Sequence, residues 1–237
     1  MSDPQYFQAS SKLLVELARS IQLLDHKLVE KEGYSHKDAR IVALRNLDAN
    51  VSSVIMVHMM WAAVERGVLD LGPIQAAMAL DTEAVPLAVR RLEYLLRVGL
   101  VVLYQFEIEG LLKNLLVALH KSAPSGFYKV VESLLDAITV KSKKKKLKTL
   151  NALALIRNSL HNTGIHKPPS KKSAQVTIDG VTYKFRYGKR VTCAGWAQLI
   201  PIMRAGLKVL EDICLSPQIL ALPHPIRNEY VAQVDPY

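Results

Sequence analysis

Apolar residues recur at helical spacing through most of this 237-residue chain. Between Leu13 and Leu28 they fall mostly three or four positions apart, with charged residues between them, which is typical of an amphipathic helix. The same spacing predicts further helices over residues 38–66, 74–80, 83–98, 100–121, 127–140 and 193–215. Half of the residues are hydrophobic, enough for helices of this kind to bury a sizeable core. We therefore expect an all-α fold, an antiparallel helical bundle.

The period of the pattern changes after Gly164. Pro168 and Pro169 cannot continue a helix, because proline lacks the backbone N–H and clashes with the preceding turn. Beyond this loop, apolar and polar residues alternate on both sides of Asp179-Gly180, a dipeptide that favours the tight turn of a β-hairpin. We therefore expect one β-hairpin, at about 175–188, inserted into the bundle.

These patterns divide the sequence into three regions. Residues 1–82 are expected to form an N-terminal helical region that packs on the bundle, and residues 83–215 a helical domain that carries the hairpin. Within the second region, Phe106 and the leucines after it are spaced to face a core. Residues 216–237 hold four prolines and are expected to wrap the surface or to contact another chain.

The charge is distributed unevenly along the chain. Residues 1–120 carry 12 Lys and Arg against 14 Asp and Glu, whereas residues 121–237 carry 19 against 7, so the positive excess lies in the second half. Six lysines stand among residues 141–148. This asymmetry favours a polyanionic partner, although a lysine-rich segment can also be a solvated surface that keeps a protein soluble.

The two cysteines and the apolar stretches bear on the compartment. Cys193 and Cys214 are the only cysteines, so we expect a reducing compartment. Neither has a neighbouring Cys or His at metal-ligand spacing, so we expect no metal. No cofactor is expected either. The first residues lack the features of a signal peptide, and the longest uncharged apolar stretch is too short to cross a bilayer. The sequence therefore predicts a cytoplasmic protein without a membrane segment.

One short segment carries residues suited to chemistry on RNA. A helix that opens in the lysine-rich segment and persists to His161 places Arg157 one turn before that histidine and on the same face, and Asn158 and Asn162 repeat the relation beside them. Histidine can accept or donate a proton near neutral pH, and arginine matches the geometry of a phosphate. One histidine cannot serve as both base and acid, so a second copy from a symmetric partner chain is expected. The alternative is that these residues are only the polar end of a core helix, with Arg157 paired to a carboxylate such as Glu109.

The segment Arg157-Asn158 followed by His161-Asn162, late in a helical chain, resembles the signature of the HEPN (higher eukaryotes and prokaryotes nucleotide-binding) superfamily. The resemblance covers roughly residues 90–215, and residues 106–116 are similar to the earlier HEPN helix that carries an acidic residue, here Glu109. The usual spacing leaves four to six residues between Arg and His, and this sequence has three.

The resemblance implies a metal-independent endoribonuclease of a toxin–antitoxin or antiviral defence system. Members act as homodimers with facing motifs, bind single-stranded RNA, and some pair with an antitoxin or another defence protein. The implied catalytic residues are Arg157, His161 and Asn158, and the implied supporting residues are Glu109 and Asn162. The basic segments add predicted nucleic-acid-binding residues: Lys143, Lys144, Lys145, Lys146, Lys148, Lys184 and Arg186.

Two features leave alternatives open. In the hairpin, Tyr183, Phe185 and Tyr187 could stack on bases, or alternation could bury them and leave only the cations in solvent. Residues 72–104 resemble the helix–turn–helix part of winged-helix DNA-binding regulators, with Arg90 and Arg91 on the second helix. A helical interaction module without catalytic activity is the third reading.

Overall fold

The computed structural model describes residues 4–70, 72–77 and 84–230. This part of the chain is mostly helical with one two-stranded antiparallel sheet, which confirms the expected all-α fold with an inserted hairpin. The elements in chain order are α1 (Pro4–His26), a π-helical turn η1 (Lys27–Lys31), α2 (Ala39–Glu65), α3 (Gly72–Ala77), α4 (Ala84–Ala118), α5 (Phe127–Ala137), α6 (Lys143–His161), β1 (Ala174–Ile178), β2 (Val181–Phe185), α7 (Trp196–Cys214) and α8 (Pro217–Leu220).

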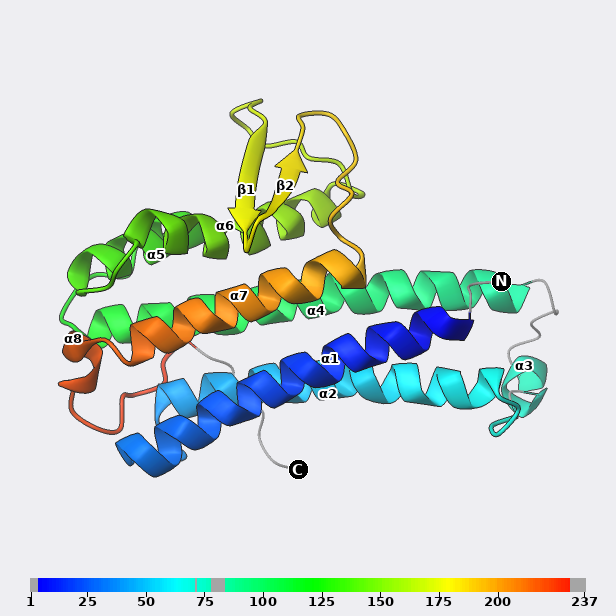
Figure 1. Cartoon of the computed structure of the whole chain (residues 1–237), viewed down its shortest axis with the longest axis horizontal. Coiled ribbons are helices and arrows are strands. Elements are labelled where there is room, and N and C mark those ends of the chain that lie inside the picture. The colour runs from blue at the N-terminus through cyan, green and yellow to red at the C-terminus, as the bar shows by residue number, and fades with distance from the viewer. Residues whose placement is uncertain (1–3, 71, 78–83, 231–237) are drawn as a thin grey trace.

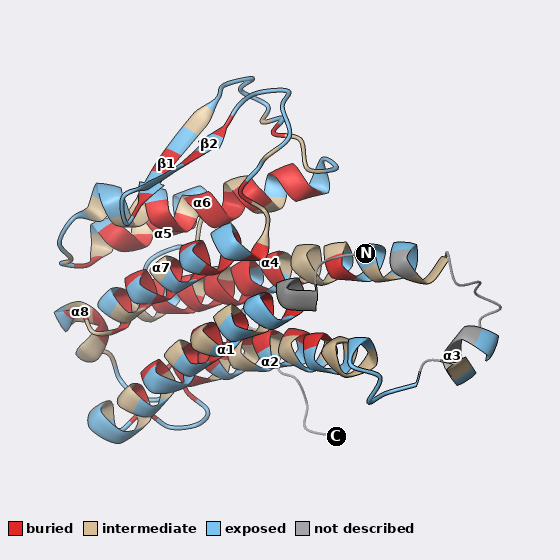
Figure 2. Ribbon diagram, turned by 45° about the vertical axis from the view of Figure 1, so that its right-hand side comes forward, coloured by how far each residue is buried: buried red, intermediate tan, exposed pale blue. Residues whose placement is uncertain are grey.

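The long helices lie side by side along the long axis of the molecule (Figure 1). Helix α1 packs on α2 and α7, helix α4 contacts α2, α5 and α6, and α6 also contacts α7. Buried side chains from both halves of the chain join in a single hydrophobic core (Figure 2). The N-terminal helices therefore share one core with the rest of the bundle.

Helix α4 covers two segments that the spacing predicts to be helical, residues 83–98 and their continuation over 100–121. The structure has one helix of 35 residues there. Gly99, at the junction, stays helical. Glycine in a helix costs only about 1 kcal/mol relative to alanine, which the packing of the following turns on α5 and α6 offsets.

The β-hairpin stands on α6 (Figure 1). Asp179 and Gly180 have φ angles of 48° and 82°, the left-handed conformations that this tight turn requires. The alternation places one face of each strand against the bundle: Val176, Ile178, Tyr183 and Phe185 are buried. A lone hairpin is marginally stable in water, so this one depends on its contact with α6.

A buried ion pair fixes the C-terminal segment to the start of α2. Arg40 donates two hydrogen bonds of 2.7 Å to the carboxylate of Asp38, and both side chains are fully buried. Arg40 also donates to the Ile219 carbonyl and lies 2.8 Å from His224 Nδ1, and the N–H of Ile226 donates to Asp38. We call this group the Asp38–Arg40 node. Through it the tail wraps the bundle up to residue 230, and residues 231–237 lie outside the described part.

Helix α2 is the one described helix whose length and apolar composition would allow it to cross a membrane. One face of it is buried in the core between Ala39 and His58, whereas Arg45 and Ala49 on its other side, and Met56, Met59 and Met60, are exposed. Core helices of soluble proteins can have the same length and apolar composition.

Candidate functional site

The predicted Arg–His segment forms the last two turns of α6. Ile156 and Leu160 point inward and are buried, while His161 and Asn158 are exposed. The helix ends in a tight cap, in which the N–H of Gly164 donates to the Ser159 carbonyl at 2.8 Å. The catalytic candidates therefore lie at an open helix end, with an apolar face that anchors them to the bundle.

Arg157 is held in place by two neighbours. Its guanidinium donates to the side-chain oxygen of Asn158 through Nε at 3.2 Å and Nη2 at 3.0 Å. It also lies over the ring of Phe106 on α4, 5.9 Å from the ring centre. The expectation that Phe106 faces the core is wrong: 51% of this residue is exposed. The outer face of α4 is uncovered here, and the arginine lies against it.

The side chain of His161 is open to solvent. Its imidazole makes no hydrogen bond or ion pair with any described residue. Asn162 is engaged instead in the helix cap, where its side-chain NH₂ donates to the Asn158 carbonyl at 2.9 Å. Of the four polar residues, one histidine is thus open to solvent, while the arginine and the two asparagines are bonded to one another.

Glu109 lies on the same side of α4 as Phe106 but does not pair with Arg157. Its carboxylate forms an ion pair with Lys113, with 2.8 Å between Oε1 and Nζ. Glu109, Phe106 and Lys113 line a cavity of about 390 Å³. Arg157 does not line this cavity; it lies over the ring of Phe106, which does, and the negative charge of Glu109 is balanced there by Lys113.

Two residues behind the site were missed by sequence reasoning. Ser159 is buried on the inner side of α6, and its hydroxyl lies 3.4 Å from Nδ1 of His166. His166 is buried against Phe185 of the hairpin, with 5.6 Å between the ring centres. His166 lies in the proline-rich loop, where no periodicity signals burial. Only the folded hairpin places it behind α6.

The lysine cluster occupies the first turn of the same helix. Cations are unfavourable at a helix N-terminus, and here Lys143 lies 3.8 Å from Asp136 while Lys146 forms an ion pair with Asp212. Lys144, Lys145 and Lys148 are exposed. Lys143 and His161 are the first and last residues of this 19-residue helix, which places them about 27 Å apart along its axis. The cluster and the Arg–His pair therefore lie at opposite ends of α6.

The hairpin exposes basic side chains to solvent but buries most of its aromatic rings. Lys184 and Arg186 are exposed, whereas Tyr183 and Phe185 are buried against the bundle. Burial removes both rings from any stacking on bases. Tyr187, after β2, is 42% exposed.

The region that resembles a winged helix continues as helix where a wing would follow. Residues 100–118 all belong to α4, so this segment has no hairpin. The turn between α3 and α4 includes residues 78–83, which lie outside the described part.

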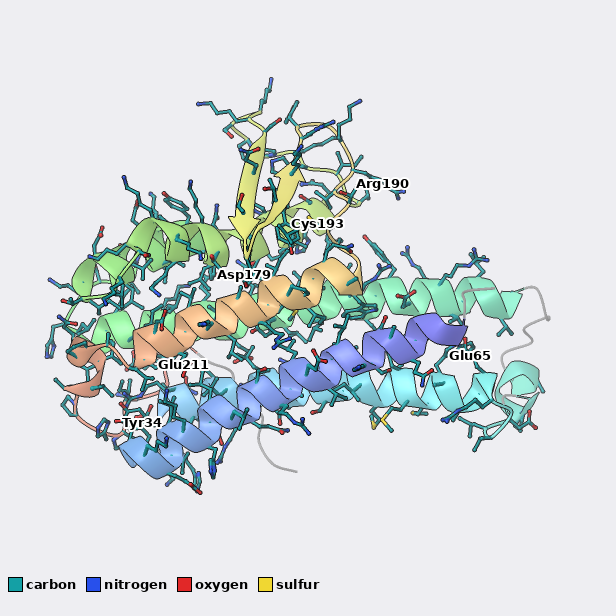
Figure 3. All side chains as sticks on the ribbon, viewed as in Figure 1. Tyr34, Glu65, Asp179, Arg190, Cys193 and Glu211 are labelled. Atoms are coloured by element: carbon teal, nitrogen blue, oxygen red, sulfur yellow. The ribbon has the colours of Figure 1, made fainter. Side chains whose placement is uncertain are left out.

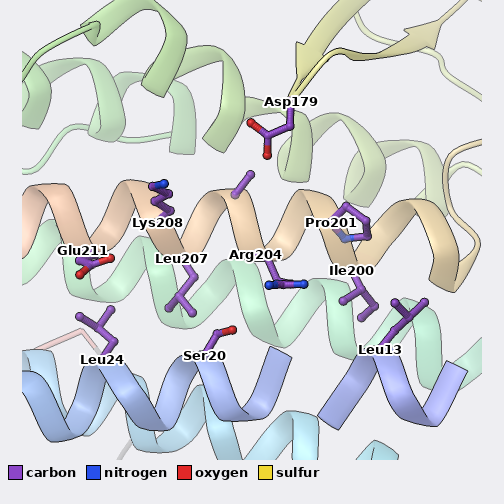
Figure 4. A pocket seen from close by; sticks show the side chains of 11 residues that line it. Leu13, Ser20, Leu24, Asp179, Ile200, Pro201, Arg204, Leu207, Lys208 and Glu211 are labelled. Atoms are coloured by element: carbon purple, nitrogen blue, oxygen red, sulfur yellow. The ribbon is translucent and has the colours of Figure 1, made fainter. Parts of the chain in front are cut away.

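A larger cavity, of about 520 Å³, lies between α1 and α7 near the hairpin tip at Asp179 (Figure 4). Its floor is apolar, and its charges are of both signs. Arg204 pairs with Glu16 at 3.2 Å, and Glu211 pairs with Lys27 at 2.8 Å. The lining carries two cations, Arg204 and Lys208, and two carboxylates, Asp179 and Glu211, so it has no net charge that would favour a polyanion.

The cysteines and acidic residues give no sign of another reaction centre. Burial raises the pKa of Cys193 to about 11 and that of Cys214 to about 12, so both thiols stay protonated and unreactive at neutral pH. In the described ranges, no three His, Cys, Asp or Glu side chains gather as a metal site would require.

Comparison with models of known protein families, with curated proteins and with solved structures gives no match for this chain.

Proposed function

We propose that this protein is an HEPN-like RNA-binding protein that cleaves single-stranded RNA without a metal, in a defence or toxin-type system. The observation that carries the proposal is the end of α6, where an exposed imidazole with no partner in the described chain stands one turn from a positioned guanidinium.

These groups suit cleavage by the 2′-hydroxyl of the RNA itself. His161 takes the proton of the 2′-hydroxyl, the 2′-oxygen forms a bond to phosphorus, and the bond from phosphorus to the 5′-oxygen breaks. Arg157 holds the phosphate and offsets the charge that builds on its oxygens. His161 of the partner subunit gives a proton to the departing 5′-oxygen. The products are a 2′,3′-cyclic phosphate and a 5′-hydroxyl.

An apolar face beside the site supports the homodimer that this chemistry needs. Leu92, Leu95, Leu103 and Phe106 are exposed on α4 at intervals that keep them on one side of the helix. Exposed apolar patches of this kind mark interaction sites. The patch ends at Phe106, on which Arg157 lies. A second copy bound to this face would thus bring its own α6 close to the first.

The test is cleavage of a 5′-labelled single-stranded RNA in the presence of EDTA. Wild-type protein should release fragments with 2′,3′-cyclic phosphate ends, and His161→Ala should slow the reaction by about 10²–10⁴-fold. Arg157→Ala should also abolish cleavage. His120→Ala, an exposed histidine at the end of α4, is the matched control and should leave the rate unchanged. Mass measurement in solution should give twice the chain mass.

RNA left intact by the wild-type protein would contradict the nuclease proposal. In that case, tight binding to duplex DNA that weakens in Arg90→Ala would favour a DNA-binding regulator. A protein that binds neither nucleic acid would be an interaction module.

A further inference from the structure

A small cavity lies at the end of α6, next to the Arg–His pair. It measures about 280 Å³ and is formed by the last turn of α6, the first half of α4 and the loop before α7. Its lining includes Tyr94, Arg97, Thr163, Arg190 and Thr192. The cavity and the catalytic candidates share the same turn of helix, because Leu160 and Gly164 also line it.

Arg97 brings an incompletely bonded guanidinium to this cavity. Its Nε atom is buried and has no hydrogen-bond partner in the described chain. The nearest carboxylate oxygen, on Glu93, is 3.9 Å away, and it already accepts a hydrogen bond of 3.1 Å from the indole of Trp196. A buried donor without an acceptor is costly, and an anion in the cavity would satisfy it.

Arg190 lines the same cavity. It lies in the loop between β2 and α7 (Figure 3), and the backbone of this loop is fastened to the end of α6, where the Val191 N–H donates to the Gly164 carbonyl at 2.9 Å. Nε of Arg190 is about 4.0 Å from the point at which a Cβ on Gly164 would stand. Its side chain makes no ion pair with the rest of the described chain. Two arginines thus face one cavity that holds no carboxylate of its own.

We propose that this cavity binds the phosphate of a single nucleotide. Paired guanidinium groups grip phosphate oxygens with charge-assisted hydrogen bonds, and the hydroxyls of Thr163 and Thr192 add neutral donors. Tyr94 provides a ring for the base. The volume is close to the lower limit of small-molecule sites, about 300 Å³, so it suits one nucleotide and not a duplex. The inference rests on the proposed function, in that RNA supplies the nucleotide next to the cleaved bond; a free nucleotide has the same chemistry.

The experiment measures binding of two probes. The first is a short fluorescent single-stranded RNA, bound to His161→Ala protein so that it stays intact. The second is adenosine 5′-monophosphate, compared with adenosine. Arg97→Gln and Arg190→Gln should each weaken RNA binding by about tenfold, since each removes charge-assisted hydrogen bonds to the phosphate. Arg19→Gln, an exposed arginine on α1, is the matched control and should bind as the parent does.

The outcomes separate this inference from the proposed function. RNA binding that both variants weaken supports a strand nucleotide in the cavity. If the protein binds the monophosphate but neither adenosine nor RNA, the ligand of the cavity is a free nucleotide. The nuclease proposal then fails, and the phosphate site stands. If neither substitution weakens RNA binding, neither slows RNA cleavage when His161 is present, and the monophosphate does not bind, the cavity is not a phosphate site although the nuclease stands. Arg190→Gln changes an exposed residue, so it tests the site even if Arg97→Gln disturbs folding.

Discussion

Asp38 and Arg40 form an ion pair whose two side chains are fully buried. Burial alone would raise the pKa of Asp38, but hydrogen bonds from the Arg40 side chain and from the N–H groups of Ile226 and Arg40 hold it below its ordinary value of 3.8. A carboxyl whose pKa is lower in the folded state stabilises that state at every pH above its pKa in the unfolded chain. This contribution is lost as the pH falls through the pKa of the folded state. The Asp38–Arg40 node is therefore strongest near neutral pH and fails in acid.

Replacement of Arg40 by Met should destabilise the protein by about 3–5 kcal/mol at neutral pH, because it leaves the carboxylate of Asp38 buried without its partner. Urea unfolding measures this loss. The matched control is Arg45→Met on the same helix, where an exposed arginine lies 3.6 Å from Asp25 and should contribute no more than about 1 kcal/mol. Equal losses in the two variants would contradict a special role for the node.

His58 should make the stability depend on pH. Its ring is buried between Phe7 and Trp196, and burial lowers its pKa below 6.5, an effect that Glu93 opposes and Arg97 adds to. The unfolded chain therefore takes up a proton at higher pH than the folded chain does, so the free energy of unfolding decreases as the pH falls below about 6.5.

The variant His58→Leu, similar in volume, should unfold within about 1.5 kcal/mol of wild type at pH 8. Between pH 6.5 and 5 it should lose less stability than wild type, as denaturant unfolding at a series of pH values would show. Parallel pH curves for the two proteins would mean that His58 does not titrate in this range.

The β-hairpin and helix α6 support each other. Phe185 is fully buried and touches His166, which lies behind the end of α6. Two backbone hydrogen bonds, from His166 to Lys189 and from Gly188 to His166, close the loop around this contact. The hairpin thus supports the inner side of the helix whose outer side carries Arg157 and His161.

Truncation of Phe185 to Ala should lower the free energy of opening the hairpin by about 3–5 kcal/mol. Limited proteolysis should then cut within residues 166–190 while the helical circular dichroism signal remains, and RNA cleavage should fall. Val181→Ala changes an exposed residue of the same strand and should alter stability by no more than about 0.5 kcal/mol. A hairpin as resistant as wild type in Phe185→Ala would show that α6 does not rely on it.

The sequence predicts this level of structure well where the signal is local. Helical spacing and the dipeptide Asp179-Gly180 are read within a few residues, and the helices and the hairpin follow from them. The burial of His166 and the exposure of Phe106 depend on which elements meet, so spacing could not supply them. The small cavity at the end of α6 is the extreme case, because its arginines stand 93 positions apart in the sequence, at Arg97 and Arg190.

For the whole molecule, the positive excess of the second half should govern RNA affinity. Replacement of the exposed Lys144, Lys145 and Lys148 by Gln should weaken RNA binding and reduce the slope of log affinity against log salt by about two, since each phosphate contact on a single strand contributes about 0.7. Titrations at several salt concentrations measure the slope.

The matched control replaces three exposed cations of the first half, Lys12, Lys31 and Lys37, by Gln. This variant removes the same three positive charges, but from residues 1–120, which carry no positive excess. The slope should stay near the wild-type value. If the two triple variants lose the same slope, the charge acts through the net field of the molecule and the lysine cluster is not a contact site.

The Asp38–Arg40 node also imposes an order on biosynthesis. Its hydrogen bonds join residues 38–40 to Ile219 and Ile226, which are 179 to 188 positions later in the chain. A nascent chain whose last part is still inside the ribosome already holds α1 and α2, yet the charges at the start of α2 have no cover. The Asp38–Arg40 node can therefore be completed only after the segment around Ile226 has left the ribosome, and until then its two charges lack these partners.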